Sequence, residues 1–66
     1  MRYLIKRELS YGTTYMGVSA ERIRKVTEER VRLYGFKTLE GAERAMERAS
    51  KYMTTAKLTI IPFPID

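Results

Sequence analysis

The sequence predicts an α+β fold in two layers, in which an antiparallel sheet packs against one amphipathic helix. Two patterns predict this class. Apolar and polar residues alternate over residues 2–9, which is typical of a half-buried strand. Over residues 38–53 the apolar residues instead recur every three or four positions, which is typical of a helix with one apolar face. The 66 residues suffice for a single domain, 1–66, with a small core.

The N-terminal segment predicts a β-hairpin. Arg7 interrupts the apolar parity of the strand at residues 2–9. Gly12 follows this strand, and glycine tolerates the positive φ angles that tight hairpin turns require. Residues 13–18 are rich in β-branched and aromatic side chains, which favour strands. We therefore expect this second segment to return antiparallel to the first.

Residues 19–35 support two interpretations. As one helix, the segment would begin with Ser19 as its N-cap and end at Gly35, although an arginine interrupts its apolar stripe. As an extended segment, residues 23–26 form a short third strand and residues 27–29 a turn. The valines and the threonine of this segment are weak helix formers, which favours the strand and turn.

The helix at residues 38–53 has the clearest pattern in the chain. Thr38 is a suitable N-cap, and Glu40 precedes Arg44 by four residues, the spacing of a stabilising ion pair on a helix surface. The apolar side chains expected to face the sheet are Leu39, Ala42, Met46, Ala49 and Met53. The small alanines among them suit a helix that lies close to a sheet.

Residues 57–61 predict the last strand of the sheet. Pro62 and Pro64 are expected to end it, because proline lacks the N–H group that a ladder of hydrogen bonds needs. Ile60 and Ile61 place apolar side chains on both parities, so both faces of this strand are expected to be covered. Together with the small core, this pattern predicts a homodimer.

The order of these segments resembles that of short phage and prophage reading frames. The segments that carry the resemblance are RYLI at 2–5, YMGV at 15–18 and FKTLEGAE at 36–43. In these proteins a hairpin precedes a helix start of the form F-x-T-x-E-x-A, and a strand closes the fold. The resemblance implies this fold and a mobile-element origin. Because these proteins are largely uncharacterised, it implies no activity.

A second resemblance covers less of the chain. Gly17-Val18 and Phe36-x-Thr38 are similar to segments of AP2 and integrase-arm DNA-binding domains, in which three strands pack on one helix. The gap between the two segments is shorter than in that family, and the tryptophans that the family uses on its sheet are absent. This resemblance implies a related α+β fold, and it assigns no functional residues to the chain.

The composition argues against an enzyme. Neither histidine nor cysteine occurs, which removes the commonest general base, the strongest nucleophile, disulfides and thiolate zinc sites. The four glycines are scattered rather than gathered in a phosphate-binding loop. We therefore expect no catalytic residue, cofactor or metal. The apolar runs are far shorter than the about 20 residues that span a bilayer, and no signal-peptide pattern follows Met1, which predicts a cytoplasmic protein without membrane association.

Basic residues outnumber acidic ones by 13 to 8, and the excess is concentrated in the first half of the chain. Residues 1–36 hold eight basic and four acidic side chains. Arginine forms bidentate contacts with phosphate, and exposed tyrosines stack on unpaired bases. The candidate contacts to a nucleic acid or a protein partner are Arg22, Arg24, Lys25, Arg30, Arg32 and Tyr15.

Two classes of function are consistent with these features. The first is a small basic protein that binds a host or phage protein, or a second copy of itself, without catalysis, because arginine and tyrosine are enriched at the centres of protein interfaces. The alternative is a nucleic-acid-binding accessory domain that uses a surface of arginine, lysine and tyrosine. Salt distinguishes the two classes, since binding to phosphates weakens steeply as the ionic strength rises.

Overall fold

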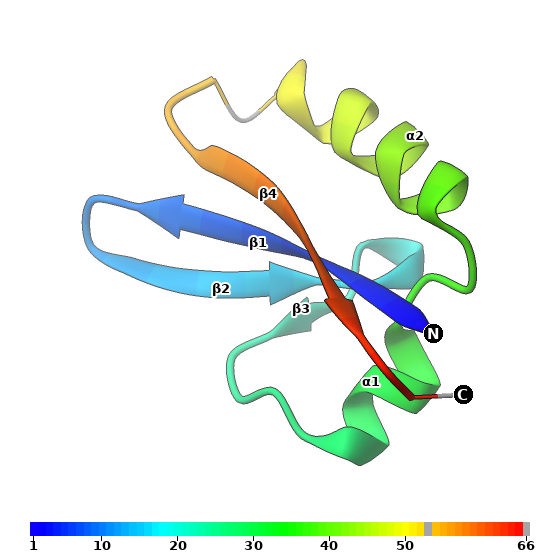
Figure 1. Cartoon of the computed structure of the whole chain (residues 1–66). Helices are drawn as coiled ribbons and strands as arrows, with labels where there is room; N and C mark the ends of the chain where they lie inside the picture. The colour runs from blue at the N-terminus through cyan, green and yellow to red at the C-terminus, as the bar shows by residue number, and fades with distance from the viewer. Residues whose placement is uncertain (53, 66) are drawn as a thin grey trace.

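The computed structural model describes residues 1–52 and 54–65 (Figure 1). Within these residues, four antiparallel strands form one sheet in the order β3-β2-β1-β4. The strands are β1 (Arg2–Leu9), β2 (Gly12–Met16), β3 (Arg22–Ile23) and β4 (Lys57–Phe63). The helices are α1 (Glu28–Tyr34) and α2 (Leu39–Ser50), and a short 3-10 turn spans Val18–Ala20. The predicted α+β class is confirmed, with its hairpin, third strand, helix and C-terminal strand.

β1 lies inside the sheet and is buried on both of its faces. Leu4 and Ile5 are neighbours in the chain, and both are 0% exposed. Because successive side chains of a strand point to opposite faces, the two residues belong to different apolar clusters. We call the face of Leu4 the α1 face and the face of Ile5 the α2 face, after the helix that covers each of them (Figure 1).

The α1 face is covered by a helix that the favoured interpretation of the sequence did not include. Val31 of α1 packs in one cluster with Leu4 and with Ile23 of β3, and each of these side chains is at most 1% exposed. The sheet therefore carries a helix on each face instead of on one. This arrangement gives a short chain two small cores that share β1.

The segment between β2 and α2 contains elements of both interpretations of the sequence. A single helix from Ser19 does not form, because Ser19 and Ala20 have φ angles of 59° and 57°, in the left-handed region. β3 supplies the third strand but is shorter than the predicted 23–26. Thr27, expected in a turn, instead caps α1, and its Oγ1 accepts a hydrogen bond of 3.2 Å from the backbone N–H of Arg30.

The apolar stripe predicted for α2 is buried at Ala42, in the first turn of the helix, and at Ala49, near its end. Ala42 and Ala49 are 0% and 8% exposed, and Met46 packs against the cluster of the α2 face from a partly exposed position. Leu39 is 47% exposed and belongs to neither cluster. Met53 lies outside the described residues.

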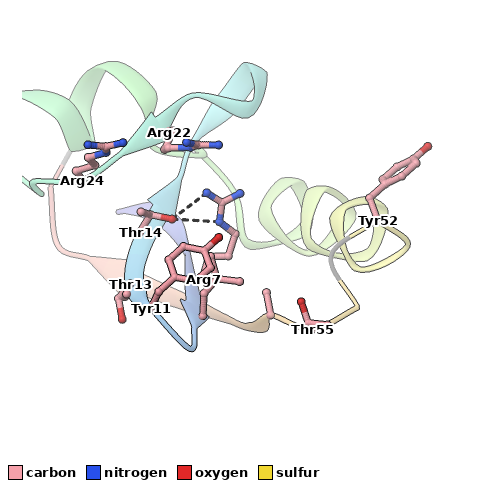
Figure 2. Close-up of a pocket in the computed structure, with 11 residues that line it drawn as sticks. Arg7, Tyr11, Thr13, Thr14, Arg22, Arg24, Tyr52 and Thr55 are labelled. Carbon is pink, nitrogen blue, oxygen red and sulfur yellow. Dashed lines mark hydrogen bonds between the residues drawn. The ribbon is translucent and has the colours of Figure 1, made fainter.

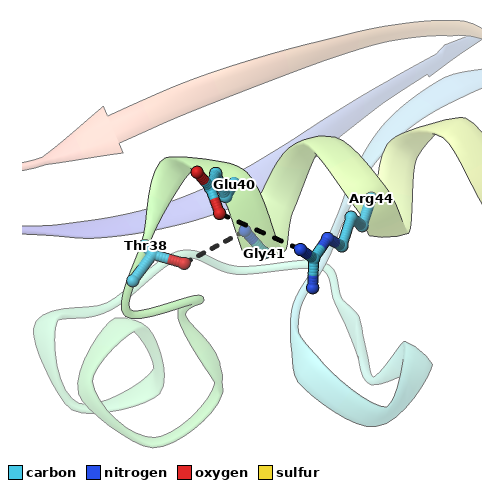
Figure 3. Close-up of polar contacts among 4 residues, drawn as sticks. All are labelled: Thr38, Glu40, Gly41 and Arg44. Atoms are coloured by element: carbon cyan, nitrogen blue, oxygen red, sulfur yellow. Dashed lines mark hydrogen bonds and ion pairs between the residues drawn. The ribbon is translucent and has the colours of Figure 1, made fainter.

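The start of α2 is stabilised as the sequence predicts (Figure 3). Thr38 Oγ1 accepts a hydrogen bond of 3.0 Å from the backbone N–H of Gly41, which satisfies one of the free donors of the first turn. Glu40 and Arg44 form the expected ion pair, at 3.9 Å. The helix ends at Ser50, three residues before the predicted end. Neither α2 nor any other helix of the described residues is long and apolar enough to cross a membrane.

β4 continues past the residue that was expected to end it. The predicted strand 57–61 extends to Phe63 and includes Pro62, which lies opposite Tyr3 of β1. Tyr3 exchanges both of its backbone hydrogen bonds, of 3.0 and 2.8 Å, with Phe36 on its other side. Its N–H and C=O groups therefore point away from β4, and the pairing does not need the N–H that Pro62 lacks.

Candidate functional site

A hollow opens on the α2 face, between the β1–β2 hairpin, β3 and the segment that follows α2 (Figure 2). It has a volume of about 450 Å³. The charged and aromatic side chains that line it are Arg7, Arg22, Arg24, Tyr11 and Tyr52. We call it the arginine hollow. No carboxylate is found among the described residues that line it, so its charged groups are all positive.

Arg7 forms part of the floor of the arginine hollow. Its side chain points to the same face of β1 as that of Ile5, two residues earlier, and so lies just beyond the core of the α2 face. Its partner across the hairpin is Thr14. Its guanidinium donates two hydrogen bonds to Thr14 Oγ1, of 3.1 Å from Nε and 2.9 Å from Nη2. The register of the hairpin therefore fixes the orientation of this half-buried cation (Figure 2).

Arg22 and Arg24 border the same hollow from β3 and the residue after it. Arg22 pairs with Met16 in the sheet, which places it on the α2 face, and Arg24 follows two residues later on the same parity. Both side chains are exposed, and neither makes an ion pair with a described carboxylate. Their charges are therefore available to an anion from solution.

Two tyrosines complete the rim of the arginine hollow. Tyr11 lies in the turn of the hairpin and is 85% exposed, and Tyr52 follows α2 and is 81% exposed. In the view of Figure 2 the Tyr11 ring lies beside Arg7, and the Tyr52 ring lies farther off and points away from it. Rings this exposed contribute little to the core, so they leave a large apolar surface open to a ligand.

The positive charge of the hollow is confined to one side of α2. A second hollow, on the flank of α2 that faces away from β3, contains Glu43 and Glu47. Three guanidinium groups in one concavity repel one another, and a bound anion relieves that repulsion. Guanidinium groups also match the planar, bidentate geometry of phosphate oxygens. The arrangement is therefore chemically suited to bind phosphate groups.

The structure brings only part of the predicted basic cluster together. Arg22 and Arg24 line the arginine hollow, and Lys25 follows them as an exposed residue. Arg30 lies on α1, which packs on the other face of the sheet, and its Nη1 donates a hydrogen bond of 3.4 Å to the carbonyl oxygen of Lys25. These residues therefore do not share one surface.

The two remaining candidates have structural contacts. Arg32 pairs with Glu28 one turn away on α1, at 2.6 Å. Tyr15 is half-buried on the α1 face, where it packs against the cluster that contains Leu4 and Val31. Neither residue lines the arginine hollow.

Sequence reasoning missed three of the charged and aromatic residues that line the hollow. Arg7 could have been found, because it is the charged residue that interrupts the apolar parity of β1, and a charge at such a position marks where the core ends. Tyr11 could have been found as a large aromatic residue in a predicted turn, where it has no core to fill. Tyr52 has no comparable pattern, since only the path of the chain after α2 brings it there.

Comparisons of the chain with protein-family models, curated proteins and solved structures find no match.

Proposed function

We propose that the protein is a non-enzymatic nucleic-acid-binding protein of the cytoplasm that contacts phosphate groups through Arg7, Arg22 and Arg24. The observation that supports this proposal is the arginine hollow, which three arginines line without any described carboxylate. A net charge of +5 adds a long-range attraction toward polyanions. Of the two classes predicted from the sequence, this was the alternative.

The physical basis of the proposed binding is counterion release. Each phosphate that a basic side chain neutralises makes the slope of log K against log salt more negative, by about 0.9 on duplex DNA and about 0.7 on a single strand. Binding of this kind without sequence recognition has dissociation constants of about 10⁻⁴ to 10⁻⁶ M at physiological salt. We expect affinities in this range for the chain.

The test compares two double variants that lose the same charge. Arg22→Gln/Arg24→Gln removes two cations from the hollow, whereas Arg30→Gln/Arg32→Gln removes two from α1 on the other face. Fluorescence anisotropy with labelled oligonucleotides between about 50 and 200 mM salt measures the slope. We expect the hollow variant to flatten it by about 1.4 to 1.8 units and the α1 variant to leave it nearly unchanged. An equal loss in both variants would show that only net charge matters, and no binding by the parent chain at low salt would refute the proposal.

A second candidate function is the binding of a protein partner from host or phage, and it is supported by the outer edge of β4. The backbone N–H and C=O groups of the even-numbered residues of β1 point toward β4, because those of Tyr3 bond to Phe36 on the opposite side. Leu58 and Ile60 consequently direct their backbone groups away from β1, toward the open edge. An added strand from a partner would pair there, and such pairing loses little affinity as salt rises. Capture of a partner that persists in the Arg22→Gln/Arg24→Gln variant and at high salt would support this second function.

A further inference from the structure

We infer that the arginine hollow binds single-stranded rather than duplex nucleic acid, with Tyr11 and Tyr52 stacking on unpaired bases beside the phosphates that Arg22 and Arg24 contact. This inference rests on the proposed function and specifies its ligand. It is carried by three features of the hollow: its aromatic rim, its concave shape and the distribution of charge around it.

The aromatic rim supplies a surface that phosphate binding alone does not need. Tyr11 and Tyr52 are 85% and 81% exposed, and both line the same hollow as the arginines. A tyrosine ring offers a face on which any base can stack, and stacking requires a base that is free of its duplex neighbours. The rings come from different elements, the hairpin turn and the segment after α2, and neither belongs to an apolar cluster of the core.

The shape of the hollow disfavours a duplex. A protein reads duplex DNA by placing a projecting helix or β-ribbon in a groove, with its phosphate contacts on either side. Here Arg7 lies at the floor of a concavity of about 450 Å³, bounded on one side by the segment after α2. A volume of this size is that of a small-molecule pocket, which admits a flexible nucleotide but not a rigid double helix.

The charge around the hollow restricts the path of a bound strand. Glu43 and Glu47 line the far flank of α2 and repel phosphates there, whereas Arg48 lines the flank that faces β2, together with Tyr52. Arg22 lies in β3 and Arg24 directly after it, and neither forms an ion pair with a described carboxylate. A bound strand is therefore expected to follow the cations of the hollow and to avoid the flank of α2 that carries Glu43 and Glu47.

The test measures binding of four probes of about 12 nucleotides, a length within the range of single-strand binding sites. The probes are a labelled oligothymidylate, an oligouridylate, an abasic strand with the same phosphates, and a duplex. We expect both single strands to bind more tightly than the duplex, and the abasic strand to lose most of the difference. Tyr11→Ala and Tyr52→Ala should each weaken single-strand binding by about 5-fold to more than 100-fold without changing the salt slope.

Conservative variants separate stacking from a structural effect. Tyr11→Phe and Tyr52→Phe keep the ring and should bind as the parent chain does, and circular dichroism should show that all four variants are folded. A preference for either the thymidylate or the uridylate strand supports the inference and shows which nucleotide is favoured, since the two differ in the 5-methyl group of the base and in the sugar. Duplex binding as tight as single-strand binding, or alanine variants that bind normally, would refute it. Binding that depends on Arg22 and Arg24 but not on the tyrosines would refute this inference and leave the proposed function standing.

Discussion

The substitution Val31→Ala tests whether α1 stabilises the protein by closing the α1 face. Val31 is 1% exposed and packs with Leu4 and Ile23. Loss of two buried carbon groups removes about 1.6 kcal/mol of transfer free energy. The cavity that remains increases the destabilisation, and the higher helix propensity of alanine reduces it by about 0.5 kcal/mol. We expect the free energy of unfolding to fall by about 1–2 kcal/mol. That is a large share of the about 3–5 kcal/mol available to a chain this small.

The assay is thermal and urea unfolding followed by circular dichroism. A loss of this size should lower the Tm by about 4–16 °C, because 1 kcal/mol corresponds to about 4–8 °C in a domain of this length. Leu33→Ala is the matched control, since Leu33 lies on the same helix, is larger, and is 61% exposed. It should change the Tm little. A larger loss for Leu33→Ala than for Val31→Ala would show that α1 presents a different side to the sheet and would refute the packing described above.

Three further outcomes are expected. Gly17→Ala should destabilise the fold by about 1–3 kcal/mol in urea unfolding, because its Cβ would meet the backbone of Tyr34 at the end of α1, and an unchanged midpoint would contradict that close approach. Ala42→Asp should abolish cooperative unfolding, since it buries a carboxylate. Met46→Asp should lower the stability less, because Met46 reaches the surface, and equal losses of stability would place α2 in another register. Sedimentation up to high micromolar concentration should reveal a dimer that pairs through the open edge of β4, and a monomer throughout would exclude it.

Local patterns predicted the elements whose signals lie within a few residues. The alternation in β1, the N-cap at Thr38 and the alanine stripe of α2 depend on neighbours one to four positions apart, and the structure contains each of them. The segment from Ser19 to Tyr34 was harder, because its valines favour a strand while its N-cap and apolar spacing also fit a helix. Tertiary contacts decided it: Ile23 and Val31 both pack against Leu4, so one residue joins a strand while the other joins a helix.

The end of β4 shows the same limit of local rules. Pro62 predicts a stop when it is considered alone, because it cannot donate a hydrogen bond. The strand continues because Tyr3, the residue opposite, already bonds to Phe36 on its other side. That partnership joins residues more than 30 positions apart, and no window of sequence around the proline contains it.

The sequence by itself determined the α+β class, the positive charge and the absence of histidine and cysteine chemistry, since these depend on composition and on local periodicity. Only the tertiary structure decided which arginines lie together. The register of the hairpin sets Arg7 against Thr14, the pairing of β2 with β3 puts Arg22 on the same face, and the end of α2 adds Tyr52. The packing of Val31 against Leu4 and Ile23 places α1, with Arg30 and Arg32, on the opposite side of the sheet. Residues close in sequence are separated and distant ones are gathered because strand register and helix packing are non-local.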